Sequence, residues 1–154
     1  MSHDEHDSQD SANDTQLNGL GETLDVLAPI RRHRLTLAEQ AWRRQSQVLA
    51  ALHARLLSMT AELEALREAH RHARIEQRER HAHRALPLSE MNDWLAAERQ
   101  AIRQIERSEK QLSDLQHEHQ QQKLWAEDSQ RELRKRQRDV EKLDFLVDLA
   151  REAS

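Results

Sequence analysis

Apolar residues recur along the first half of the chain at alternating steps of three and four. This spacing lines up one side of an α-helix and is typical of the a and d positions of a coiled coil. We call these positions the apolar seam. Its members are Leu35, Ala38, Trp42, Gln45, Leu49, Leu52, Leu56, Met59, Leu63, Leu66, His70 and Ala73, all apolar except Gln45 and His70.

The second half of the chain carries a weaker seam with the same spacing. A helix opens with Met91, Trp94 and Leu95, and the regular repeat begins at Ile105. Polar residues interrupt it more often than in the first half. Its members are Ile105, Ser108, Leu112, Leu115, His119, Gln122, Ala126, Ser129, Leu133, Arg136, Val140, Leu143, Val147 and Ala150.

Between the two stretches lies Leu86-Pro87-Leu88-Ser89. Proline disfavours helix at the residue before it, and Ser89 is a favourable N-cap for a following helix. Pro29 is tolerated only near the start of a helix. No glycine follows Gly21. The sequence therefore predicts a first helix over residues 27–85, a turn at 86–89 and a second helix over residues 90–152.

The two seams match each other when the chain is folded back at the break. When Leu35 is paired with Val140 and Met59 with Leu115, the other seam residues of the two stretches also fall opposite each other. The midpoint of the pairs lies at Pro87. The predicted fold is thus all-α, a long helical hairpin that forms an antiparallel two-stranded coiled coil over residues 24–152. The alternative is a parallel homodimer in which Pro87 only kinks the helix.

Composition supports a helical fold that buries only a stripe of each helix. Charged residues make up 34% of the chain and aromatic residues 3%, too much charge and too few large rings for a thick core. Residues 1–23 are acidic and polar, which predicts a disordered tail. The net charge is −4, and the remainder is nearly balanced in sign, so nucleic acid is not an expected partner.

The same sequence offers no recognisable catalytic site. A glycine-rich phosphate loop is missing, and two helices provide no concave pocket that would exclude water. His70, His72, His81 and His83 are spaced by two within each pair, so they do not share a helix face, and no metal site is expected. There is no cysteine. No apolar run is long enough for a membrane span, and the first residues lack the basic and apolar regions of a Sec-type signal peptide, so we expect neither. We expect neither an enzyme nor a cofactor.

The two ends of the predicted hairpin differ in chemistry. The turn end is polar and rich in histidine and arginine. Its candidate contact residues are Arg84, Leu86, Leu88, Met91, Trp94 and Leu95. The terminal end combines arginines with apolar residues in excess of what the seam needs. Its candidate contact residues are Arg31, Arg32, Arg34, Arg134, Arg136, Arg138, Phe145 and Leu146.

The excess apolar residues of the terminal end are Phe145, Leu146 and Leu149. Exposed apolar clusters of this kind are usually covered by something. Two alternatives are open, since either residues 24–30 of the same chain wrap over them or a partner does.

The chain combines the hairpin pattern with the start Ile30-Arg31-Arg32-His33-Arg34, the step Ala38-Glu39-Gln40 and a closing run from Arg134 to Ala150. In these features it resembles the FliJ/YscO family. Members of this family are central stalk proteins of flagellar and virulence type III secretion systems. The resemblance covers residues 24–152. The acidic residues that precede it depart from the compact start expected of the family.

The resemblance implies a non-enzymatic stalk at the cytoplasmic side of the inner-membrane secretion apparatus. Its terminal end would insert into a hexameric export ATPase and promote its assembly and activity. The contact residues of the terminal end given above would make this contact. Its turn end, from Arg84 to Leu95, would reach the cytoplasmic domain of the export gate. Export chaperones are a further class of partner, and the isolated protein would be a monomer without direct membrane insertion. The alternative is a generic coiled-coil scaffold, possibly homodimeric.

Overall fold

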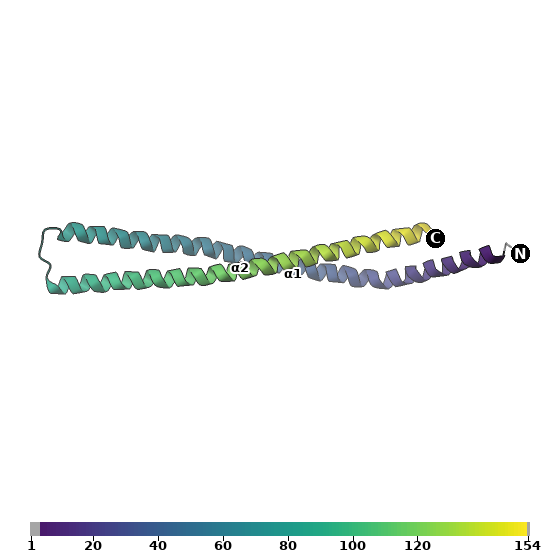
Figure 1. Cartoon of the computed structure of the whole chain (residues 1–154), viewed down its shortest axis with the longest axis horizontal. Helices are drawn as coiled ribbons and strands as arrows, with labels where there is room; N and C mark the ends of the chain where they lie inside the picture. Colours follow the sequence, from purple (N-terminus) through teal and green to yellow (C-terminus); the bar gives the residue numbers. More distant parts are fainter. Residues whose placement is uncertain (1–3, 154) are drawn as a thin grey trace. The chain divides into compact units, whose positions relative to one another are not determined.

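The computed structural model describes the backbone of residues 4–153, with the side chains of residues 15, 16 and 19–153. Two helices, α1 (Asp4–His81) and α2 (Leu88–Ala153), pack against each other, and the described range contains no strand (Figure 1). The predicted all-α helical hairpin is confirmed.

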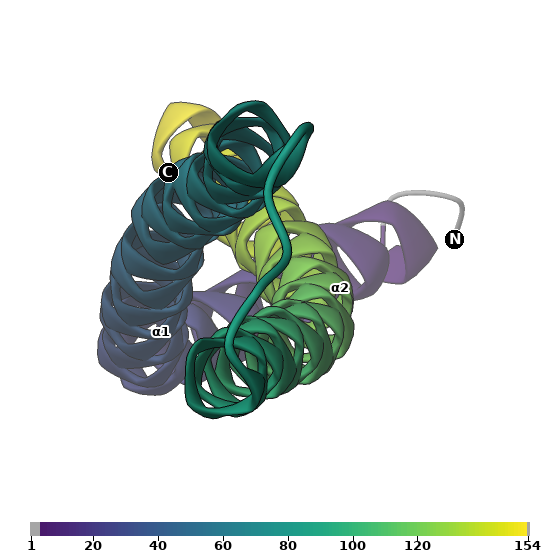
Figure 2. The ribbon, with the colours of Figure 1, turned by 90° about the vertical axis from the view of Figure 1, so that its left-hand side faces the viewer.

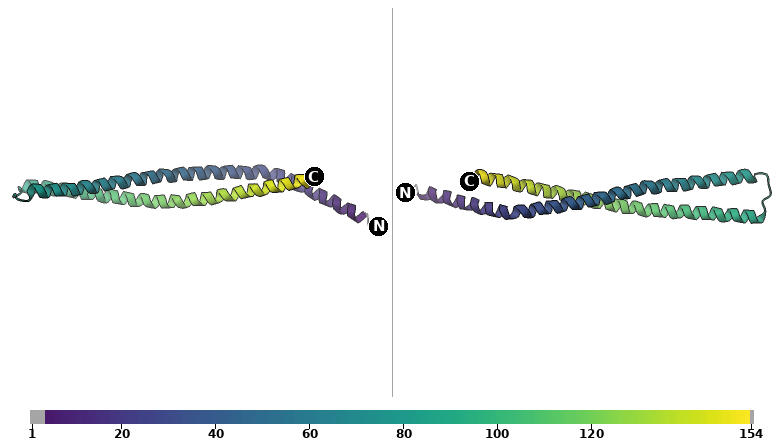
Figure 3. Two further views of the ribbon diagram at one scale, coloured as in Figure 1. Left: turned by 90° about the horizontal axis from the view of Figure 1, so that it is seen from above. Right: turned by 180° about the vertical axis from the view of Figure 1, so that it is seen from behind.

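The chain divides into two units, each with one segment of α1 and one segment of α2. The terminal unit comprises Met1–Ser46 and Trp125–Ser154, and the loop unit comprises Gln47–Leu124. In the loop unit, residues 82–87 cross from the end of α1 to the start of α2, as the view onto this loop shows (Figure 2). In the terminal unit, the segments of α1 and α2 run antiparallel in both views of Figure 3.

Burial follows the predicted seam closely. Among the seam positions of α1, only Ala73 is exposed, and every seam position of α2 from Ile105 to Ala150 is buried or half-buried. The inward row of α2 also extends towards the loop through Trp94, Glu98 and Ala101. The repeat of three and four predicts which residues are buried, because an α-helix places these positions on one side.

Each unit has a thin core of its own. In the terminal unit, the buried apolar residues include Leu24 and Leu143, and Leu143 is 0% exposed. In the loop unit, they are Leu52, Leu63 and Leu115, beside a buried Gln122 that is 5% exposed. A polar residue at a seam position lowers stability but fixes the register of the two helices.

The start of α1 differs from the prediction. The helix begins at Asp4, within the segment predicted to be a disordered tail, and it contains Pro29 in its interior. Proline removes one backbone hydrogen bond and crowds the preceding turn. The helix continues through it because Leu24, on the N-terminal side of Pro29, is only 4% exposed and extends the seam by another turn.

The connection also differs from the predicted turn at residues 86–89. Helix α1 ends at His81, whose carbonyl accepts a 3.5 Å hydrogen bond from the Arg84 N–H. Helix α2 begins at Leu88, and the Pro87 carbonyl accepts the first helical hydrogen bond, 3.1 Å from the Met91 nitrogen. Pro87 is therefore the N-cap residue, and Ser89 lies inside the first turn of α2. Pro87 suits this place because its own missing N–H leaves no donor unpaired.

Replacing Leu143 by alanine should lower the free energy of unfolding by about 3 kcal/mol, because the change opens a cavity at the most buried side chain of the terminal unit. The matched control is Leu146→Ala on the exposed side of the same helix, with an expected loss of about 1 kcal/mol or less. Urea unfolding followed by far-ultraviolet circular dichroism measures both. Equal losses would contradict the assigned core.

Candidate interaction surfaces

The loop unit contains a hollow where the two helices meet the loop. Its volume is about 560 Å³. The last turns of α1 supply cationic groups, whereas the loop and the first turns of α2 supply apolar ones. The lining residues are Arg74, Gln77, Arg78, His81, Ala82, Leu86, Met91 and Trp94.

Ionic contacts connect the helices next to this hollow. Glu98 occupies an inward position of α2, and its Oε1 lies 3.0 Å from His70 Nε2 and 3.3 Å from Arg74 Nε. Both His70 and Glu98 are largely shielded from solvent, whereas the nearby pair of Arg67 and Glu109 is exposed at 3.1 Å. Near the loop, the inward positions of the two helices are thus joined by contacts between polar side chains.

The structure brings only part of the predicted turn-end residues together. Leu86, Met91 and Trp94 line the hollow, and Arg84 lines a neighbouring depression. Leu88 and Leu95 are exposed on the first turns of α2 and do not line this hollow.

The contribution of α1 to the hollow was missed from the sequence. Gln77 lines it, and its Oε1 atom is buried without a hydrogen-bond partner among the described residues. The continued seven-residue spacing from His70 to Gln77 was a usable signal, because it places Gln77 on the inward side of the helix.

The predicted arginines of the terminal unit fall into two groups. Three of them make contacts within the unit, two across the helix pair and one within α2. Arg31 donates to the Asp139 carbonyl at 3.2 Å, Arg32 lies 3.5 Å from the Asp144 carboxylate, and Arg136 pairs with Glu132 at 2.8 Å.

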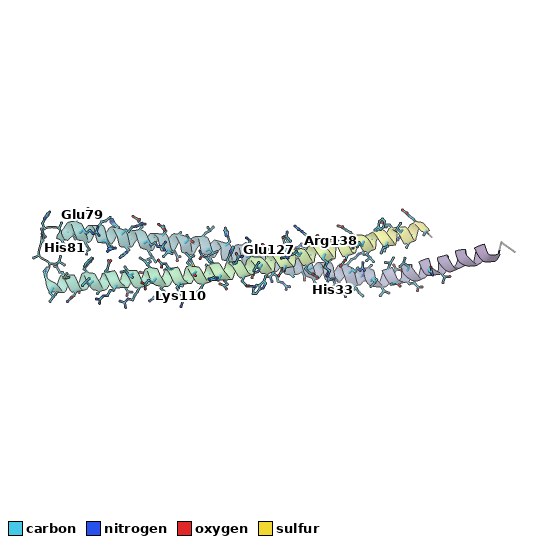
Figure 4. The ribbon with its side chains drawn as sticks, viewed as in Figure 1. His33, Glu79, His81, Lys110, Glu127 and Arg138 are labelled. Carbon is cyan, nitrogen blue, oxygen red and sulfur yellow. The ribbon has the colours of Figure 1, made fainter. Side chains whose placement is uncertain are left out.

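The other three are exposed and available to a partner. They are Arg34, Arg134 and Arg138. Arg138 donates only to the Arg134 carbonyl of its own helix, at 3.4 Å, and its side chain is labelled in Figure 4.

The excess apolar residues of α2 are not covered by the start of this chain. Phe145 is 63% exposed, and Leu146 and Leu149 are exposed as well. Residues 24–30 are part of α1, which continues through Pro29, and in this helical position they leave the three side chains exposed. The alternative in which a partner covers these residues stays a prediction.

Histidines do not assemble a metal centre in the described part of the chain. His53 and His119 approach each other across the loop unit, with ring centroids 5.9 Å apart. Within the described residues, no group of three or more His, Asp or Glu side chains is placed to hold a metal ion.

Neither α1 nor α2 contains, in its described residues, a stretch apolar and long enough to cross a bilayer. Comparison of the chain with family models, curated proteins and solved structures found no match.

Replacing Glu98 by alanine should destabilise the loop end by about 1–2 kcal/mol, because His70 and Arg74 lose a shielded common acceptor. In the matched control, Glu109→Ala, the lost ion pair is exposed, and the expected cost is about 0.5 kcal/mol or less. Amide hydrogen exchange over residues 70–81 measures the difference. If both variants exchange alike, the Glu98 contacts do not hold the loop end.

Proposed function

We propose that this protein is a non-enzymatic stalk or adaptor of a bacterial type III secretion export apparatus. In this proposal, the terminal unit binds a hexameric export ATPase and promotes its assembly and activity. The loop end contacts the cytoplasmic domain of the export gate, and export chaperones are further partners. The proposal places the protein in the cytoplasm, at the periphery of the inner-membrane apparatus.

The observation that carries the proposal is the chemistry of the terminal unit. It exposes Phe145, Leu146 and Leu149, and it also exposes Arg34 and Arg134, which form no ion pair with any described residue. Aromatic residues, arginine and large apolar residues at an exposed site are typical of protein interfaces. The helical hairpin agrees with the fold that the FliJ/YscO resemblance implies.

A second feature supports contacts at both ends. The loop unit presents a hollow with apolar walls and the cationic groups of Arg74 and Arg78, with His81 beside them. Its surface chemistry differs from that of the terminal unit, where exposed apolar side chains stand out from the helices. Two different surfaces suit a protein that joins two different partners.

The alternative function is that of a generic coiled-coil scaffold, possibly acting as a homodimer. The helical hairpin alone fits it equally well. The two functions differ in whether the exposed residues of the terminal unit recognise a specific protein.

The decisive experiment mixes the purified protein with the export ATPase encoded in the same genome and measures association and the rate of ATP hydrolysis. We expect binding and stimulation. Arg34→Glu should raise the protein concentration needed for half-maximal stimulation about fivefold or more, because it reverses an exposed charge of the terminal unit. Arg107→Glu makes the same charge change at an exposed position of the loop unit, and it should leave the stimulation within about twofold.

Absence of both association and stimulation would leave the generic scaffold as the function. Equal effects of the two substitutions would place the contact outside the terminal unit.

A further inference from the structure

The two helices of the terminal unit share a heptad register that defines two sides of the helix pair. Position a is occupied by Ala28, Leu35 and Trp42 in α1, and by Val140 and Val147 in α2. Positions b and e then lie on one side of each helix and positions c and g on the other, with f at the back. In an antiparallel pair, e positions approach e positions and g positions approach g positions.

The ion pair between Arg32 and Asp144 confirms this arrangement, because both residues occupy e positions and their charged groups lie 3.5 Å apart. The g positions therefore meet on the opposite side of the pair. There the register places Leu27 of α1 next to Leu146 of α2, and Leu27 is half-buried. Ile30 and Leu149, at c positions, flank them on either side.

Exposed large apolar residues of the terminal unit are absent from the b and e side of the helix pair among the described residues. Positions b and e carry polar residues throughout the described unit, with the exception of Pro29. The exposed large apolar residues all lie at c, g or f. They are Leu20, Val26, Ile30, Leu37, Trp125, Phe145, Leu146 and Leu149. We use the word groove for the strip of exposed apolar side chains along the c and g positions of the two helices. Such a strip matches the apolar stripe of a third amphipathic helix.

The charges around this groove have one predominant sign. Its acids are largely taken up within α2, since Asp128 lies 3.0 Å from Arg131 and Glu132 lies 2.8 Å from Arg136. Asp139 is also within 3.9 Å of Arg136. At the c, g and f positions, several cations form no ion pair with any described residue. Only one acid at these described positions, Glu152, also forms none. These cations are Arg34, Arg44, Lys135, Arg138 and Lys142.

We propose that the c/g side of the terminal unit binds an acidic amphipathic helix of a partner protein, which completes a three-helix bundle. The apolar stripe of that helix packs on Leu27, Ile30 and Leu146, and its carboxylates face Lys135 and Lys142. A second copy of this chain is a poorer occupant, because the same groove on both copies would bring like charges together. The inference deepens the proposed function by giving the chemistry of the partner segment, and it rests on that function only for the identity of the partner.

The test uses two fluorescent synthetic peptides of about three heptads, each with leucine at its a and d positions. One carries glutamate at e and g, and the other carries lysine there. Fluorescence anisotropy with the full-length protein, without any ATPase, should show at least about tenfold tighter binding of the acidic peptide. Equal affinities, or no binding of the acidic peptide at about 1 mM protein, would overturn the proposal.

Variants locate the binding. Ile30→Asp with Leu146→Asp should weaken binding of the acidic peptide about tenfold or more, because both anchors of the groove are lost. The control, Thr36→Asp with Gln137→Asp, adds the same charge at b and e positions of the same helices. It should change the affinity about twofold or less. Equal losses in the two double variants would refute the assigned side.

A third variant tests the charge argument. Lys135→Glu with Lys142→Glu should reduce the preference for the acidic peptide by about tenfold, while circular dichroism shows unchanged helix content. An unchanged preference would refute the role of these lysines. Because the ATPase is absent, these outcomes are independent of whether the protein stimulates ATP hydrolysis, and failure of the ATPase experiment alone would leave the groove assigned.

Discussion

The structure depends on one packing constraint, which is that two helices can bury only the side chains that face each other. In a coiled-coil pair these are the a and d positions, and the remaining positions stay in contact with solvent. Leu143 is fully buried, yet its neighbour in sequence, Asp144, is exposed. Stability therefore resides in a narrow stripe, whereas most of the surface is free to vary. The recognition chemistry of this protein has to be sought among the exposed positions.

The stripe itself changes in character towards the loop. Leu52 and Leu63 pack through apolar contact, but farther along the same helix His70 and Gln77 occupy the inward positions. Polar groups at such positions cost stability unless they find partners. His70 finds one in Glu98, whereas the Oε1 atom of Gln77 has none among the described residues. Polar inward positions thus lie next to the hollow, so the same part of the loop unit that lacks an apolar seam also contains open space.

The seam could be predicted from periodicity, and the hairpin from the position of the proline break at the midpoint between the two seams. The start of α1 could not, because the effect of Pro29 depends on whether residues before it find a surface to pack on, and Leu24 does. The roles of the arginines were also beyond the sequence. Arg31, Arg32 and Arg34 are chemically identical and close in sequence. Arg31 and Arg32 contact α2, whereas Arg34 is exposed and makes no such contact. Long side chains can reach several positions, and only the placement of the opposite helix selects among them. The position of Gln77 in the lining of the hollow was missed because Gln77 is polar and the apolar repeat ends at Ala73.

The sidedness of the terminal unit has the strongest bearing on function. A two-helix unit without a partner would have no reason to gather its exposed apolar residues. Single apolar residues among polar neighbours are ordinary on a protein surface, whereas a contiguous apolar patch is typical of an interaction site. Here the b and e positions are almost wholly polar, and the apolar groups lie at c, g and f. The two sides are therefore suited to different contacts. Arg134, at a b position, and Arg34, at a g position, point the exposed charge of the unit in two directions. A partner that surrounds the unit, as a ring would, can use both sides, whereas a single helix can use only the apolar one. Occupation of the groove by a helix would leave the polar side free, so the same short unit has room for two kinds of partner at once.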